Sequence, residues 1–107
     1  MNAAHSALLN DVRLYISQIG GLPVKVDVPG ILFDANGNRV KLGTKGTADS
    51  LNCIKGRFVA VEVKTGSGKL STIQRNFGRA VERAGGIFIT ARSVADVETR
   101  LRQEGLV

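Results

Sequence analysis

Residues 59–64 read Val-Ala-Val-Glu-Val-Lys, a nearly unbroken apolar run that contains two charged side chains. Such a run is typical of a strand covered on both faces, in the middle of a sheet. Side chains alternate between the two faces of a strand, so Glu62 and Lys64 share one face while Val61 and Val63 share the other. A carboxylate and an ammonium group placed there must be paired, bound to a metal or exposed at the strand end.

Helix and strand signals alternate along the rest of the chain. Apolar residues at helical spacing predict helices over residues 3–19 and 71–84, each followed by Gly-Gly, and a last helix capped by Ser93. Strands are predicted over residues 24–28, 49–54, 57–64 and 87–90. Asn36-Gly37, between residues 31–33 and 39–42, predicts a hairpin because this pair accepts positive φ. This order predicts a single α/β domain spanning residues 1–107.

The charge balance favours a polyanionic partner. Fifteen Lys and Arg against nine Asp and Glu give a net charge of +6, and basic side chains bind phosphates with release of counterions. Aromatic residues make up only 5% of the chain, which disfavours a protein that stacks bases along a row of aromatic side chains. No apolar run or signal pattern suggests a membrane, so a cytoplasmic protein is expected. Cys53, in an apolar stretch, is expected to be a buried thiol.

Asp49 opens the strand that precedes the one carrying Glu62. A tight turn at residues 55–56 folds the two strands together, and a hairpin this short brings Asp49 level with Glu62. Two carboxylates at a strand end suit Mg²⁺ or Mn²⁺, which would polarise a phosphodiester and lower the pKa of an attacking water. Lys64 would orient that water or stabilise the transition state. The simpler interpretation is a surface Glu-Lys pair beside a loop aspartate, and E-x-K spacing alone does not separate the two.

The surroundings of this motif resemble the virus-type replication-repair nuclease domain (VRR-NUC), a branch of the PD-(D/E)XK superfamily. The resemblance covers residues 43–96, about half of the chain. The matching segments occur in the family's order and spacing: Gly-Thr-Ala-Asp at residues 46–49, Gly-Arg-Phe at 56–58, Glu-Val-Lys at 62–64, Gly-Lys-Leu-Ser at 68–71, Gln74, and Gly-Gly at 85–86.

The resemblance implies a fold and an activity. The fold is a PD-(D/E)XK restriction-endonuclease-like core of order α-β-β-β-α-β, with a mixed central sheet, an inserted hairpin and a C-terminal helix. The activity is that of a Mg²⁺- or Mn²⁺-dependent DNA endonuclease, with Asp49, Glu62 and the backbone carbonyl of Val63 as metal ligands and Lys64 as base or charge stabiliser. Small members resemble homodimeric Holliday-junction resolvases of phages or prophages, acting on branched DNA. The alternative is a non-catalytic DNA-binding protein on a decayed nuclease fold.

Gln74 has two interpretations. In the family, a glutamine one turn into this helix faces the active site. Ser71 and Gln74 also form the sequence pattern of a capping box, in which the glutamine bonds back to the Ser71 amide. Both roles remain open from the sequence.

The first helix departs from the family's pattern, which usually has a glutamate there that contributes to the metal site. His5 occupies the matching position and, by helical spacing, faces inward, whereas Asp11 lies at the edge of the apolar stripe. His5 has the better direction and Asp11 the better chemistry for Mg²⁺. DNA contacts are expected, from position alone, for four basic residues in loops and on the second helix: Lys45, Lys69, Arg75 and Arg79. For the two arginines, an ordinary solvated helix face is an equally good interpretation.

Overall fold

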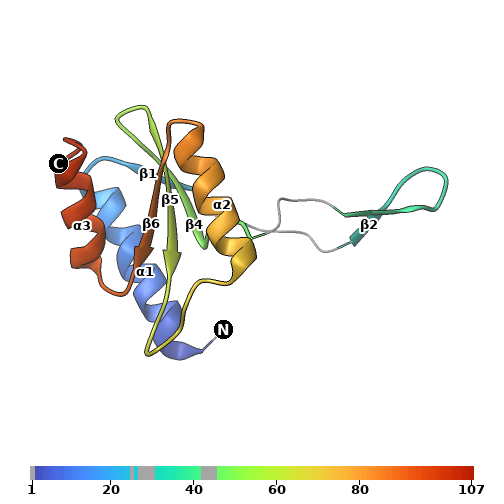
Figure 1. The fold of residues 1–107 in the computed structure, drawn as a ribbon, viewed down its shortest axis with the longest axis horizontal. Coiled ribbons are helices and arrows are strands. Elements are labelled where there is room, and N and C mark those ends of the chain that lie inside the picture. Colours follow the sequence, from blue (N-terminus) through green and yellow to red (C-terminus); the bar gives the residue numbers. More distant parts are fainter. Residues whose placement is uncertain (1, 25, 27–30, 42–45) are drawn as a thin grey trace.

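A four-stranded mixed sheet covered by three helices forms the body of the protein (Figure 1). The computed structural model describes residues 2–24, 26, 31–41 and 46–107. The elements are α1 (Ala3–Gln18), β1 (Leu22–Val24), β2 (Ile31–Phe33), β3 (Arg39–Lys41), β4 (Ser50–Ile54), β5 (Arg57–Val63), α2 (Thr72–Arg83), β6 (Ile87–Ala91) and α3 (Val94–Gln103). Their order confirms the predicted α/β architecture.

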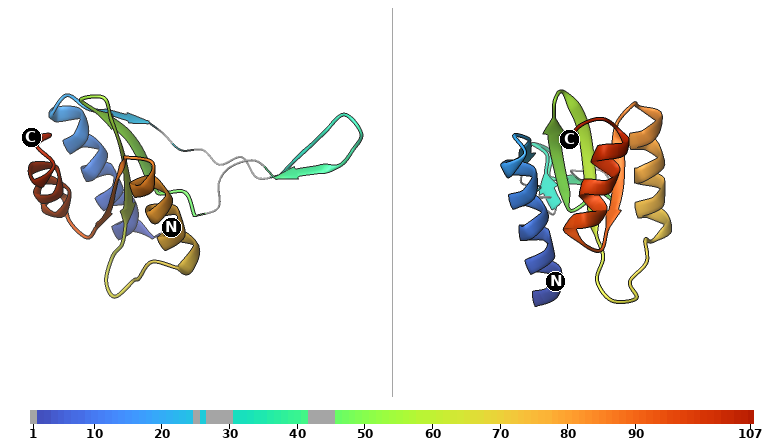
Figure 2. Two further views of the ribbon diagram at one scale, coloured as in Figure 1. Left: turned by 45° about the horizontal axis from the view of Figure 1, so that its top comes forward. Right: turned by 90° about the vertical axis from the view of Figure 1, so that its left-hand side faces the viewer.

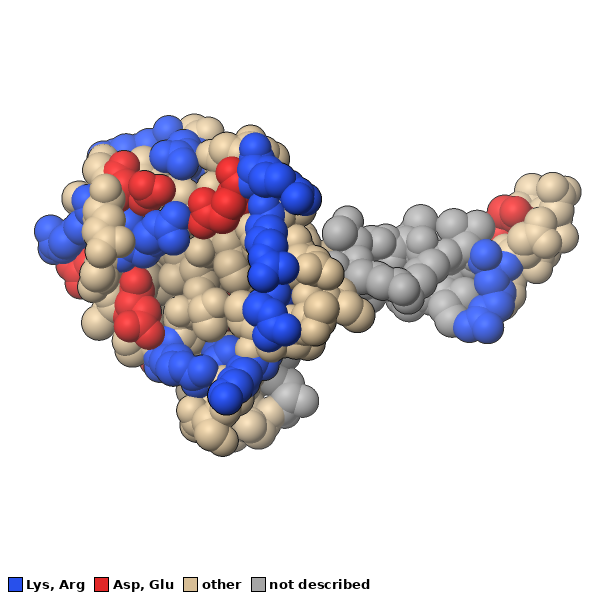
Figure 3. All heavy atoms as spheres, viewed as in Figure 1, with Lys and Arg blue, Asp and Glu red and all other residues tan. Residues whose placement is uncertain are grey.

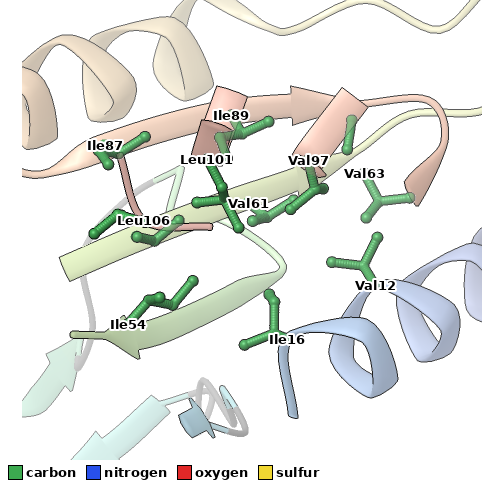
Figure 4. Close-up of a cluster of buried hydrophobic side chains, with 12 residues drawn as sticks. Val12, Ile16, Ile54, Val61, Val63, Ile87, Ile89, Val97, Leu101 and Leu106 are labelled. Carbon is green, nitrogen blue, oxygen red and sulfur yellow. The ribbon is translucent and has the colours of Figure 1, made fainter. Parts of the chain in front are cut away.

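Strand β5 is central, as its apolar sequence predicts. The order in the sheet is β1-β4-β5-β6, in which β4 pairs antiparallel and β6 parallel with β5. Val59, Val61 and Val63 are fully buried and contribute to the main core, which α1 and α3 cover from one side (Figure 4). Ala60 belongs to a second cluster, under α2 on the opposite side. Apolar side chains on both faces of β5 therefore join the two layers of helices to the sheet.

Helix α2 covers only part of its side of the sheet. It packs on β6, whereas α1 contacts β1, β4 and β5 from the other side (Figures 1 and 2). On β1, Leu22 is 63% exposed, and its neighbour in the ladder, Cys53 of β4, is also exposed. The expectation that Cys53 is a buried thiol is therefore wrong, because no helix among the described residues covers this part of the sheet on the α2 side.

The Asn-Gly hairpin forms as predicted. Strands β2 and β3 pair antiparallel, and Gly37 has φ 81°, in the left-handed region that an L residue with a Cβ rarely adopts. This two-stranded unit lies apart from the main sheet (Figures 1 and 2). The strand predicted over residues 24–28 overlaps β1 only at Val24, because β1 begins two residues earlier. Residues 25 and 27–28 lie outside the described part of the chain. None of the helices in the described ranges is long and apolar enough to span a bilayer.

Candidate active site

Asp49 and Glu62 meet at one end of the paired strands β4 and β5. Ser50 is opposite Val61 in the ladder, so Asp49, the residue before Ser50, comes level with Glu62. An Asp49 carboxylate oxygen, Oδ2, accepts a hydrogen bond of 2.8 Å from the backbone N–H of Val63. The predicted alignment of the two acidic residues is present, and the backbone of β5 holds the Asp49 side chain in place.

Glu62 is a buried carboxyl group on the α2 side of the sheet. The residue is 4% exposed, and its Oε2 lies 3.5 Å from Lys64 Nζ. The pKa of the Glu62 carboxyl is raised to about 7, mainly by burial and also by the nearby Asp49 charge, while the Lys64 ammonium group opposes the shift. Lys64 shares the face of Glu62, as strand alternation requires. The Glu-Lys pair is thus not the surface pair of the simpler interpretation.

Gln74 takes both of the roles that its sequence position allows. Its Oε1 accepts a hydrogen bond of 2.9 Å from the Ser71 backbone, and its own N–H donates to Ser71 Oγ at 3.1 Å, which completes the capping box of α2. Its Nε2 donates to Glu62 Oε2 at 3.1 Å. One side-chain amide therefore fixes the start of α2 and contacts the buried carboxyl group.

His5, in the first turn of α1, also reaches this cluster. Its Nε2 lies 3.3 Å from Asp49 Oδ2, and its Nδ1 is buried without a hydrogen-bond partner among the described residues. The helix start is fixed by Asn2, whose side chain accepts a hydrogen bond of 2.7 Å from the His5 backbone. Asp11 is exposed and lies about 9 Å further along the helix axis, at 1.5 Å per residue. Of the two candidates in α1, His5 is the one whose side chain contacts this cluster.

Arg92 binds the loop that follows Lys64 through contacts that no sequence motif predicts. Its guanidinium group donates to the carbonyl of Gly66 at 3.0 Å and also to the carbonyl of Gly68, while its backbone N–H donates to Asp96 at 2.9 Å. Gly66 and Gly68 lie in the loop that follows Lys64. No local pattern links residues 24 to 26 positions apart, so only the folded chain shows this contact.

The four residues expected to bind DNA do not all belong to the same part of the fold. Lys45 lies outside the described residues. Lys69 is exposed in the loop before α2, and Arg75 and Arg79 are exposed on α2 itself. Figure 3 shows Lys and Arg side chains gathered in a column over this helix.

The donor groups of the cluster suit a small divalent cation. Asp49 and Glu62 supply carboxylate oxygens, and Mg²⁺ is commonly held by one or two carboxylates, with water and substrate phosphate oxygens completing its shell. A cation between them would also offset the mutual repulsion that contributes to the raised pKa of Glu62. Within the described ranges, no group of three His, Cys, Asp or Glu side chains has the arrangement of a metal site. The described residues therefore offer a cation two carboxylate ligands rather than a complete coordination shell.

Comparison with known proteins identifies the fold. Neither a protein-family model nor a curated protein matches the sequence. A solved structure described as a VRR_NUC domain matches with a TM-score of 0.66 at 18% sequence identity, over 95% of this chain and 97% of that chain. The agreement extends over nearly the whole of both chains. The chain thus has the fold of a VRR-NUC domain, as its motifs predict.

Proposed function

We propose that this protein is a metal-dependent nuclease that hydrolyses phosphodiester bonds in DNA. The observation that carries the proposal is the cluster around Glu62, in which Asp49, Lys64 and Gln74 contact a buried carboxyl group at the end of a central strand. Desolvating a carboxyl group beside a partly buried ammonium group costs free energy that their attraction often does not recover, so the pair is better explained by function than by stability. The shared fold with a VRR_NUC domain supports the same function.

The roles follow from the chemistry of each group. Asp49 and Glu62, with the backbone carbonyl of Val63, would hold Mg²⁺ or Mn²⁺, which when bound polarises the phosphate and activates water. Lys64 is positioned to orient the attacking water or to stabilise the added negative charge of the transition state. Gln74 orients Glu62 through its hydrogen bond, and His5 orients Asp49 from the opposite side. Because Nδ1 of His5 has no partner among the described residues, this imidazole can also turn toward a bound cation.

The same proposal includes the DNA substrate, the oligomeric state and the biological role of the nuclease. The substrate would be branched DNA such as a Holliday junction, and the protein would act as a homodimer because a four-way junction requires two cuts. The resemblance to small phage and prophage nucleases suggests a role in replication or repair in the cytoplasm of a bacterium or an infected host. The net charge of +6 supports a nucleic-acid substrate.

A cleavage assay with matched variants tests the proposal. Junction, flap and plain duplex DNA are incubated with Mg²⁺, Mn²⁺ or EDTA. We expect cleavage with metal that falls at least 100-fold in Glu62→Gln and Lys64→Met, since removing one electrostatic stabiliser of a transition state has an effect of about this size. Glu98→Gln and Lys55→Met carry the same charge changes away from the site and should cut like the parent.

Two outcomes would contradict the proposal. Equal cleavage by the parent, Glu62→Gln and Lys64→Met would place the active site elsewhere. Salt-sensitive DNA binding without cleavage at any metal concentration would instead identify a non-catalytic DNA-binding protein on a decayed nuclease fold.

A further inference from the structure

A groove of about 510 Å³ lies between α2 and the edge strand β6. Three arginines of α2, Arg75, Arg79 and Arg83, line it together with Leu70, Phe88 and Thr90. In Figure 3 the basic column on α2 borders an area without charged side chains. We call Leu70 and Phe88 the floor of the groove and the three arginines its rim. A helix that only faces solvent does not need apolar side chains beside its basic ones, so this arrangement is typical of a binding surface.

The floor of the groove is continuous with the candidate active site. Thr90 is the ladder partner of Glu62, and Phe88 is the partner of Ala60, so all four side chains lie on the α2 side of the sheet. Adjacent strands are about 4.8 Å apart, which makes Thr90 an immediate neighbour of Glu62. A chain-like ligand lying along the groove would therefore lead to the buried carboxyl group.

Phe88 is held in a defined position on this floor. Its ring meets Phe77 edge-on, with 6.2 Å between centroids, and a Cβ atom at Gly78 would lie only 2.6 Å from the ring. Phe88 thus fills the space that the missing side chain of Gly78 leaves on α2. The residue is nevertheless only partly buried, so the groove exposes part of an aromatic side chain whose position is fixed.

The arginines on the rim keep their charge available. Their spacing of four residues repeats every 6 Å or so along the helix, close to the distance between successive phosphates in an extended strand. Arg75 bonds to the Leu70 carbonyl and to Thr72, Arg79 bonds to Asn76, and none of the three forms an ion pair with a described carboxylate. Glu82, the one acidic side chain among the described residues that line the groove, binds Arg100 at 3.0 Å and accepts a hydrogen bond of 3.1 Å from the Phe88 N–H instead.

We propose that this groove binds a single-stranded segment of DNA, with its phosphates along Arg75, Arg79 and Arg83 and one unpaired base against Phe88. A basic helix surface alone would suit a duplex equally well, but bases in a duplex are paired and stacked and cannot reach the floor. The low aromatic content limits stacking to a single base, and the arginines supply most of the attraction. This inference rests on the proposed nuclease function and narrows the branched substrates of that proposal to those with a single-stranded stretch beside the cut, such as a flap, rather than a fully paired four-way junction.

Binding without cleavage tests the groove separately from the nuclease activity. Fluorescence anisotropy of a labelled 20-nucleotide oligo-dT is measured in EDTA, with parent, Arg79→Gln, Arg83→Gln and Phe88→Leu. We expect each arginine variant to weaken binding about 3- to 10-fold and to reduce its salt dependence. Phe88→Leu should weaken binding about 5- to 10-fold, which lies within the range that one stacked base contributes. Arg102→Gln is the charge-matched control: Arg102 pairs with Glu98 on α3 and should bind like the parent.

The result that overturns the proposal is equal oligo-dT binding by the parent and all three groove variants, or binding of a fully paired hairpin as tight as that of oligo-dT. Because no metal is present, absence of cleavage in the previous assay does not affect this outcome. Oligo-dT containing 5-iodouracil then locates the base in the unaltered protein, whatever the stability of the Phe88 variant. Photocrosslinks should map to the tryptic peptide of residues 84–92, which contains Phe88, and crosslinks found only on other peptides would contradict the assignment.

Discussion

The side-chain amide of Gln74 connects the start of α2 to Glu62: its Nε2 donates to Glu62 Oε2 at 3.1 Å while its Oε1 accepts from the Ser71 backbone. The capping box fixes both the helix start and the side-chain rotamer, so the donor that faces Glu62 is held in place before any substrate binds. A capping residue thereby becomes part of the candidate active site.

Two substitutions separate these roles. Ser71→Ala removes the cap hydroxyl and should lower the free energy of unfolding by about 1 kcal/mol while leaving cleavage within about twofold of the parent. Gln74→Met removes the cap and the donor to Glu62, so a similar loss of stability should accompany a fall in cleavage of about tenfold. Urea denaturation and cleavage rates provide the two measurements. Equal cleavage rates for Ser71→Ala and Gln74→Met would mean that Gln74 only caps the helix and has no role in cleavage.

The buried carboxyl of Glu62 should make the metal-free protein less stable as pH rises. Its pKa is raised from 4.5 to about 7, so the folded state binds the proton more tightly than the unfolded state does. The stability that this proton contributes is fully present below pH 4.5 and is lost as the pH rises to about 7. The loss is about 3 kcal/mol as an upper estimate. Glu62→Gln stays neutral and should therefore exceed the parent in unfolding free energy at pH 8, but not near pH 4.5. Urea titrations in EDTA measure both, with Glu98→Gln as the control that should follow the parent.

His5 should contribute to the site whereas Asp11 should not. His5→Ala removes the imidazole that lies 3.3 Å from Asp49. We expect cleavage to fall about tenfold and the rise in Tm with added Mn²⁺ to shrink, because a metal that binds less tightly stabilises the folded state less. Asp11→Ala lies on the same helix, is exposed, and should match the parent in both measurements. A larger effect of Asp11→Ala than of His5→Ala would reverse the assignment.

The sequence predicted the elements well where their signals are local. The ends of α2 follow from Ser71 and from the glycines after Ala84, and the central position of β5 follows from its apolar run. Strand β1 begins two residues before the strand predicted over residues 24–28, because Pro23, which also ends the preceding helical pattern, lies within it. β1 is an edge strand, where a residue without an N–H is tolerated.

Features that depend on tertiary packing could not be predicted in the same way. The exposure of Cys53 depends on which half of the sheet α2 covers, and no periodicity within a strand contains that information. The groove beside α2 joins Leu70, Arg83 and Phe88, which come from a loop, a helix and a strand. By contrast, the alignment of Asp49 with Glu62 follows from the register of the hairpin between β4 and β5, which the sequence predicts.

Gly78 should be difficult to replace even though it lies inside a helix. Alanine is ordinarily more favourable there by about 1 kcal/mol. In α2, however, the new Cβ would lie 2.6 Å from Phe88 Cδ2 and 2.9 Å from its Cγ, so the whole ring would have to move rather than only its far edge. We expect Gly78→Ala to lower the free energy of unfolding by about 1–3 kcal/mol, the usual effect of overpacking. The double variant Gly78→Ala with Phe88→Leu removes the ring and should recover stability relative to Phe88→Leu alone, because only the gain in helix propensity then remains. Urea denaturation of the four proteins gives the coupling between the two sites, and a coupling near zero would show that Gly78 does not determine how Phe88 packs.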